Sequence, residues 1–156
     1  DVMGIYLQPL ESEYAFWMKG ADVLNETKNA IHHVVRMKDG EVLNRYWDYK
    51  DTARPESYRE DVELSHSTTQ APEILYRHLR AGAESGWDYS CRWFKDEKSF
   101  STIHTTEIIP VDLNCLMFHL EQTISEIYSE ERGRCSKERA HSPGKEENTG
   151  RDQGLF

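Results

Sequence analysis

The chain has 156 residues, a length that suits one domain with a buried core. Its formal net charge of −9 and pI of about 5.2 create a field that repels phosphate backbones and anionic membrane surfaces. These values exclude nucleic-acid and membrane partners but do not affect a neutral small molecule. With 30% charged and 37% hydrophobic residues, the composition is polar and predicts an incomplete core or a disordered part.

A first helix is predicted over residues 9–19. The segment begins at a proline, which suits a first helical turn, and Gly20 follows it as a stop signal. Leu10, Tyr14 and Trp17 stand at i, i+4 and i+7, so they form one apolar stripe.

A short β-hairpin is predicted next. Residues 34–37 and 41–43 flank the turn Lys38-Asp39-Gly40, and Asp-Gly is a strong signal for a hairpin turn. The two runs should therefore pair as antiparallel strands.

Two further helices are predicted over residues 72–81 and 111–128. The earlier one has Pro72 at its first position and places Leu75 and Leu79 on one face. The later one is the clearest amphipathic helix of the chain, with apolar residues spaced by three and four over four turns. These residues are Leu113, Leu116, Leu120, Ile124 and Ile127.

The stretches 45–61 and 82–94 are predicted to be irregular loops, and they are unusually rich in aromatic rings. Loops are normally polar, and long structured loops in a small protein tend to be functional. The rings are Trp47, Tyr58, Trp87, Tyr89, Trp93 and Phe94.

The end of the chain differs in composition. Residues 129–156 contain twelve Asp, Glu, Lys or Arg residues and almost no apolar ones before Leu155. The preceding helix is expected to fray near Glu131, because Gly133 follows. The chain is therefore divided into a domain over residues 1–130 and a disordered tail over residues 131–156.

Asp88 is the strongest candidate for acid chemistry. It stands between Trp87 and Tyr89, with Trp93 close by, and aromatic rings that exclude water raise the pKa of a carboxyl group. A raised pKa is what a general acid needs near neutral pH. Gly86 would let a ligand approach the backbone closely. The alternative is that Asp88 only caps a helix start, which the pattern by itself slightly favours.

A second candidate region is the polar and aromatic stretch around Arg54 and Glu56. Arginine and carboxylate groups recognise sugar hydroxyls, because each hydroxyl both donates and accepts. A surface salt-bridge network with little effect on stability is an equally good interpretation of the same residues.

No cofactor or metal site is predicted. The histidines lack ligand spacing, and no glycine-rich phosphate loop or nucleophile elbow is present. The three cysteines, an odd number without a zinc pattern, are expected to be free thiols, which favours a reducing, cytoplasmic location. They are Cys91, Cys115 and Cys135.

Several runs of residues occur in a characteristic order. They are the stretches 13–18, 43–48, 54–61, 76–93 and 109–114, which contain Arg54-Pro55-Glu56-Ser57 and Ser85-Gly86-Trp87-Asp88. In this order they resemble the bacterial-type α,α-trehalases, over about residues 5–130. The resemblance implies a mainly α fold, part of an (α/α)6 toroid with long aromatic-rich loops, and hydrolysis of trehalose to two glucose molecules with inversion.

The resemblance also implies roles for individual residues. Asp88 would be the general acid, and Arg54, Glu56, Gly86 and Trp87 would bind the sugar. Trehalose would be the partner, without cofactor or metal. Relatives of both cytoplasmic and periplasmic location exist, and the oligomeric state is left open.

The departures from the family pattern predict that this chain is an inactive fragment. The family's general base, its tryptophan-rich second signature and its first signature are not found among these residues. Two alternatives remain open, a non-catalytic sugar-binding remnant and a functionless gene fragment.

Overall fold

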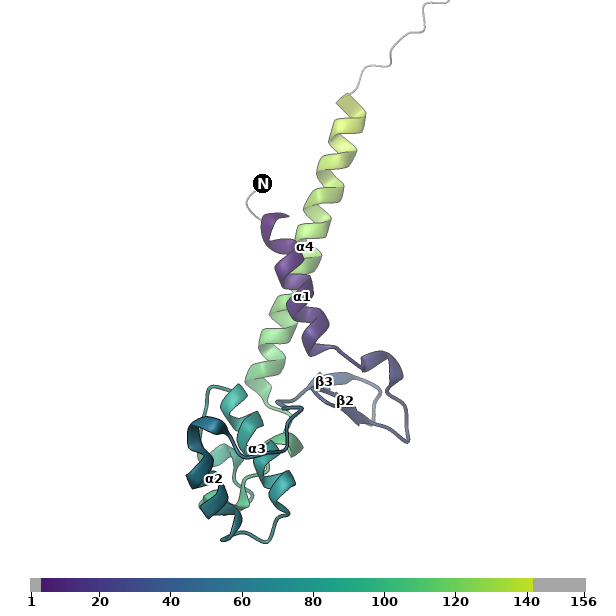
Figure 1. Cartoon of the computed structure of the whole chain (residues 1–156). Coiled ribbons are helices and arrows are strands. Elements are labelled where there is room, and N and C mark those ends of the chain that lie inside the picture. The colour runs from purple at the N-terminus through teal and green to yellow at the C-terminus, as the bar shows by residue number, and fades with distance from the viewer. Residues whose placement is uncertain (1–3, 142–156) are drawn as a thin grey trace, which may run out of the picture.

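The computed structural model describes residues 4–141 and is mainly helical, with a small antiparallel sheet (Figure 1). The helices are α1 (Leu7–Trp17), α2 (Tyr58–Ser65), α3 (Pro72–Glu84) and α4 (Val111–His141), and the strands are β1 (Ala30–Ile31), β2 (Val34–Arg36) and β3 (Val42–Asn44). Short 3-10 turns connect these elements at Gly4–Tyr6, Ala21–Val23, Pro55–Ser57, Cys91–Trp93, Phe100–Thr102 and Thr105–Glu107.

Helices α1 and α4 lie side by side and run in opposite directions (Figure 1). The Tyr128 hydroxyl of α4 donates a hydrogen bond to Glu11 of α1. The predicted first helix is confirmed, although it begins before its proline and ends at Trp17. Gly20 has φ +92, a left-handed conformation that L side chains rarely adopt, so it redirects the chain after the helix.

The sheet has the strand order β1-β2-β3 and is antiparallel throughout. The predicted hairpin is confirmed, since Val35 pairs with Leu43 across β2 and β3. Its turn closes through a 2.7 Å hydrogen bond from the Met37 amide to the Glu41 carbonyl, and Gly40 has φ +96. Strand β1 was not predicted, because its two residues are too few to show a periodicity.

The first half of α2, residues 58–61, was predicted as the end of an irregular loop, and that prediction is wrong. The segment has four charged residues within Arg59–Glu63 and no apolar stripe, so hydrophobic periodicity gives no helix signal. Its one buried residue is the charged Asp61. A buried carboxylate, together with Leu64 packed against the core, therefore fixes α2 to the rest of the chain.

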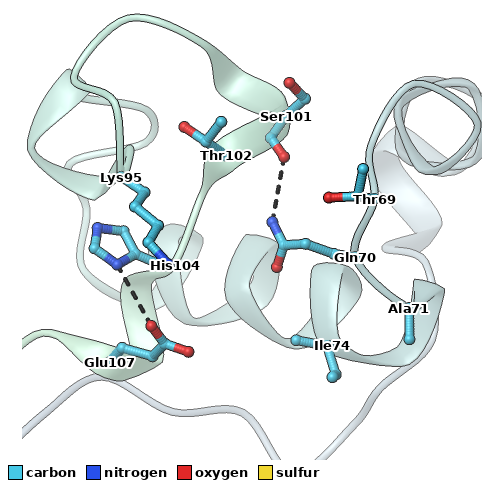
Figure 2. A pocket seen from close by; sticks show the side chains of 9 residues that line it. All are labelled: Thr69, Gln70, Ala71, Ile74, Lys95, Ser101, Thr102, His104 and Glu107. Atoms are coloured by element: carbon cyan, nitrogen blue, oxygen red, sulfur yellow. Dashed lines mark hydrogen bonds and ion pairs between the residues drawn. The ribbon is translucent and has the colours of Figure 1, made fainter.

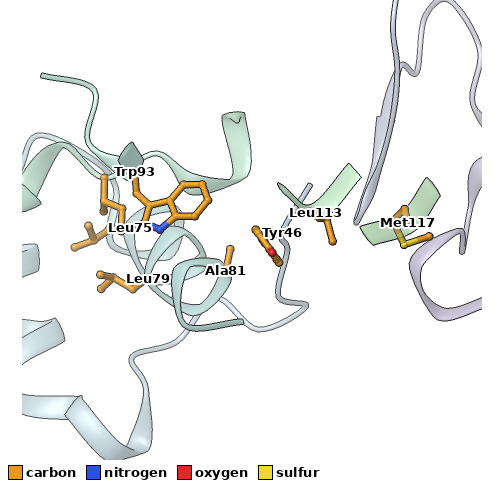
Figure 3. Packing of buried hydrophobic residues seen from close by; sticks show 8 residues of the cluster. Tyr46, Leu75, Leu79, Ala81, Trp93, Leu113 and Met117 are labelled. Atoms are coloured by element: carbon orange, nitrogen blue, oxygen red, sulfur yellow. The ribbon is translucent and has the colours of Figure 1, made fainter. Parts of the chain in front are cut away.

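The hydrophobic core joins the α2–α3 part of the molecule to α4. Leu75 and Leu79 of α3 pack with Trp93, and all three side chains are fully buried. Tyr46 lies between Ala81 and Leu113, so it links α3 to the first turn of α4 (Figure 3). Its ring meets the Trp93 ring edge-on, with centroids 6.0 Å apart.

Helix α4 was predicted to end near Glu131, but it continues past Gly133 to His141. A single glycine costs about 1 kcal/mol in a helix, which does not stop a long one. The remainder of the predicted tail, residues 142–156, lies outside the described residues. The domain boundary at residue 130 stays a prediction. None of the helices described over residues 4–141 is both long and apolar enough to cross a bilayer.

His78 should make folding depend on pH. It is buried under Thr106, whose amide donates to Nδ1, and burial lowers the pKa of His78 from 6.5 to about 4. The unfolded chain takes up this proton below pH 6.5, and the folded chain does so only near pH 4. The free energy of unfolding should therefore fall as the pH falls through this window, by roughly 2 kcal/mol at pH 5.

Urea unfolding at pH 7.5, 6 and 5 measures this dependence. His78→Asn keeps an acceptor for the Thr106 amide but does not titrate, so its stability should change less with pH than that of the wild type. His66→Asn, at an exposed histidine, is the control and should keep the wild-type slope. Equal slopes for His78→Asn and the wild type would contradict this role of His78.

Candidate functional site

The loop that carries Asp88 begins where α3 ends. The Ser85 and Gly86 amides donate to the Ala81 and Ala83 carbonyls, which closes the helix. Gly86 has φ +69, so glycine is needed here for a left-handed backbone. A Cβ atom at this position would meet no atom within 4 Å, so the space next to the Gly86 backbone is open.

Asp88 lies exposed on this loop, so the expected enclosure of its carboxylate by rings is not observed. Trp93 is buried, but Trp87 is 52% exposed. Capping of the following 3-10 turn is not the role of Asp88 either, because the Ser90 side chain accepts from the Arg92 amide. Within residues 4–141, Asp88 makes no side-chain hydrogen bond or ion pair, so its carboxylate is free to meet a ligand.

Tyr89 is the centre around which the predicted site residues gather. Its hydroxyl donates a 2.7 Å hydrogen bond to the Leu79 carbonyl, and its ring lies against Gly82 of α3. The pKa of Tyr89 is raised, and burial is the largest cause of that rise. Charges within electrostatic reach also act on this pKa: Arg54 lowers it, and Asp61, Asp88 and Glu56 raise it. The Arg54 guanidinium lies 5.2 Å from the centre of this ring, so the segment that carries Arg54 and Glu56 lies beside the loop that carries Asp88.

Arg54 is held by Asp61 of α2, a residue to which sequence analysis gave no role. Asp61 Oδ2 accepts from the Arg54 amide at 2.9 Å and from Nε at 3.0 Å, and Oδ1 accepts from Nη2 at 2.6 Å. Both side chains are buried, at 10% and 2% exposure. These hydrogen bonds raise the pKa of Arg54. The surface-network interpretation fits the exposed Arg59–Glu63 pair but not this one.

Glu56 lies in the 3-10 turn Pro55–Ser57, directly after Arg54. Its side chain is exposed, and among the described residues it has no hydrogen-bond or ion-pair partner. Its charge nevertheless acts on the pKa of both Arg54 and Tyr89. Glu56 is therefore a second free carboxylate, two residues after Arg54 in the chain.

Trp87 faces a hollow of about 570 Å³. The Arg92 guanidinium lies 4.6 Å from the centre of the Trp87 ring and pairs with Asp112 at 2.9 Å. The Trp93 indole N–H donates to the Trp87 carbonyl at 3.1 Å, which fixes the backbone of the loop. Trp87 joins this hollow to the Asp88 loop, but Asp88 itself is not in its lining.

A second, polar hollow of about 420 Å³ lies near the start of α3 and contains none of the predicted site residues (Figure 2). Gln70 donates to the Ser101 carbonyl, and His104 lies 3.6 Å from Glu107. The buried histidines elsewhere have structural partners, since His33 contacts Glu84 and His78 contacts Thr106. Over residues 4–141, no group of three or more metal-ligating side chains lies together.

Comparison with known proteins agrees with the motifs around this loop. A family model described as Trehalase matches residues 2–151. A periplasmic trehalase of Xanthomonas campestris pv. campestris (strain B100) is 49% identical over 136 residues, which are 86% of this chain and 24% of that protein. Periplasmic trehalases of Xanthomonas oryzae pv. oryzae (strain MAFF 311018) and Xanthomonas axonopodis pv. citri (strain 306) are each 48% identical over the same length.

The described chain is mainly helical, and the loop after α3 carries the motif with Asp88. The chain belongs to the trehalase family, since the family model matches nearly all of it. It spans about a quarter of the length of the curated relatives that it matches.

Gly82 should be needed to seat the Tyr89 ring. A Cβ atom at this position would stand 2.6 Å from Tyr89 Cε1, so Gly82→Ala must displace the ring. Overpacking costs about 1–3 kcal/mol, of which the better helix propensity of alanine offsets roughly 1 kcal/mol. We expect a net loss of stability in urea unfolding. In a Tyr89→Ala background the same change should be neutral or stabilising, and an equal loss in both backgrounds would show that the ring is not the cause.

Proposed function

We propose that this chain supplies the acid-bearing part of an α,α-trehalase site. Asp88 is the general acid, and Arg54, Glu56, Gly86 and Trp87 bind the sugar. The carrying observation is that the Arg54 guanidinium lies 5.2 Å from the centre of the Tyr89 ring, so the segment with Arg54 and Glu56 meets the loop with Asp88, although more than thirty residues separate Asp88 from Arg54 in sequence. Membership of the trehalase family supports trehalose as the substrate.

The proposed reaction inverts the anomeric carbon. Asp88 protonates the oxygen that links the two glucose units, and a second carboxylate activates a water molecule on the opposite face. The two carboxyl groups of an inverting enzyme lie roughly 6.5–9.5 Å apart to leave room for that water. The proposal takes this second carboxylate from outside the present chain, since the family motifs found here assign the role to none of its glutamates.

The sugar would be bound by groups of complementary kinds. The Arg54 guanidinium donates hydrogen bonds to hydroxyl oxygens, and the free Glu56 carboxylate accepts from hydroxyl hydrogens. The half-exposed Trp87 ring offers an apolar surface to a pyranose face. The open space beside Gly86 admits the ligand to the backbone.

The proposal also covers the architecture and location of the parent protein. The antiparallel pair of α1 and α4 is compatible with an (α/α)6 toroid of which this chain is a part. The expected cytoplasmic location is not supported, because the relatives carry the name periplasmic trehalase. We therefore assign the periplasm as the location.

The purified chain should bind trehalose without releasing glucose. Binding is followed by tryptophan fluorescence, because Trp87 is exposed at the proposed site, and hydrolysis by an enzymatic glucose assay. Glu56→Gln replaces a charged acceptor with a neutral one and should raise the Kd about five- to tenfold. Glu60→Gln, at an exposed glutamate nearby, is the control and should leave the Kd unchanged.

Other outcomes separate the alternatives. Glucose release that Asp88→Asn abolishes would mean that the chain contains both carboxylates. Absence of trehalose binding by a cooperatively folded chain would refute the proposed site. Absence of any cooperative thermal transition would instead favour a functionless gene fragment.

A further inference from the structure

The buried carboxylate of Asp61 binds both the side chain and the main chain of Arg54. It accepts three hydrogen bonds from Arg54: two from the guanidinium and one from the main-chain amide. These hydrogen bonds fix both the plane of the guanidinium and the backbone that carries it. The same cation lies 5.2 Å from the centre of the Tyr89 ring, which limits its movement from a second direction.

The hydrogen bonds to Asp61 leave some N–H donors of the guanidinium unpaired. Two of its five N–H donors point to Asp61, through Nε and Nη2. Nη1 has no partner within residues 4–141, and it is not among the buried side-chain atoms that lack one, so it reaches solvent. The buried guanidinium therefore keeps an unpaired Nη1 with some access to solvent, held in a fixed plane.

Asp61 also decides which anions remain free. Glu56 lies two residues after Arg54, and the Arg54 guanidinium lies 5.2 Å from the ring of Tyr89, the residue that follows Asp88. Without Asp61, the buried guanidinium would be left uncompensated and would attract the nearest exposed carboxylate. Asp61 neutralises Arg54, and Glu56 and Asp88 have no hydrogen-bond or ion-pair partner in the described part of the chain.

We propose that Asp61 is a positioning residue of the sugar site: it orients the Arg54 guanidinium toward a sugar hydroxyl and keeps Glu56 and Asp88 free for the ligand. Asp61 itself does not touch the sugar. This inference rests on the proposed trehalose site and adds to it a residue from α2.

Two substitutions test the role. Asp61→Asn removes the charge, so Arg54 is released and the trehalose Kd should rise at least about tenfold. Asp61→Glu keeps the charge but lengthens the side chain by one carbon, so the chain should stay folded while the displaced guanidinium raises the Kd about threefold or more. Glu63→Gln, which breaks the exposed Arg59–Glu63 pair of the same helix, is the control and should leave the Kd unchanged.

A purely structural role predicts a different result. In an Arg54→Gln background, Asp61→Asn should cause no further rise in Kd if Asp61 acts through Arg54, whereas general loosening of α2 would add to the loss. Near-UV circular dichroism confirms folding of each variant, and slow exchange of the Arg54 Nε–H in NMR should disappear in Asp61→Asn.

The outcomes distinguish this inference from the function on which it rests. A wild-type chain that is folded but does not bind trehalose refutes the site and this role together. A wild-type chain that binds, with folded Asp61→Glu and Asp61→Asn variants whose Kd values stay within about twofold of its own, refutes the role of Asp61 alone.

Discussion

The buried ion pair between Arg54 and Asp61 constrains the whole candidate site. Removing two charges from water is costly, and only close mutual hydrogen bonding offsets that cost. The pair therefore cannot slide or open partially without a large loss of stability. It ties α2 to the segment before it, and through the Tyr89 ring it ties both to the loop after α3. Two stretches of chain remote in sequence thus keep one relative position.

Helix α3 is the scaffold on which this constraint acts. Its apolar face, with Leu75 and Leu79, is anchored in the core beside Trp93, while its last turns receive the Tyr89 ring and hydroxyl. The loop is therefore held at several points by buried groups. Its chemically reactive side chains nevertheless stay outside the core. Rigid support beneath exposed functional groups is what orients a binding site before its ligand arrives.

Hydrophobic periodicity predicted the elements whose stability comes from apolar faces. It found α1, α3 and α4 with errors at their ends, and the Asp-Gly turn marked the hairpin. It missed the start of α2, because the charged residues of that helix show no apolar stripe and its one buried residue is a carboxylate. For the same reason Asp61 received no role, since its sequence neighbours are all polar or charged except Val62. The grouping of Asp88 with Arg54 followed from family motifs, whereas the contact through Tyr89 required coordinates.

The exposure of Asp88 bears on how a complete site could work. A general acid active near neutral pH needs a carboxyl group from which water is excluded, because desolvation disfavours the charged form. In this chain the rings beside Asp88 do not cover it, and Trp87 is itself half-exposed. Under the proposed function, water must therefore be displaced by the bound sugar and by polypeptide outside this chain. The same polypeptide would carry the second carboxylate. Exclusion of water and completion of the acid–base pair would therefore happen together.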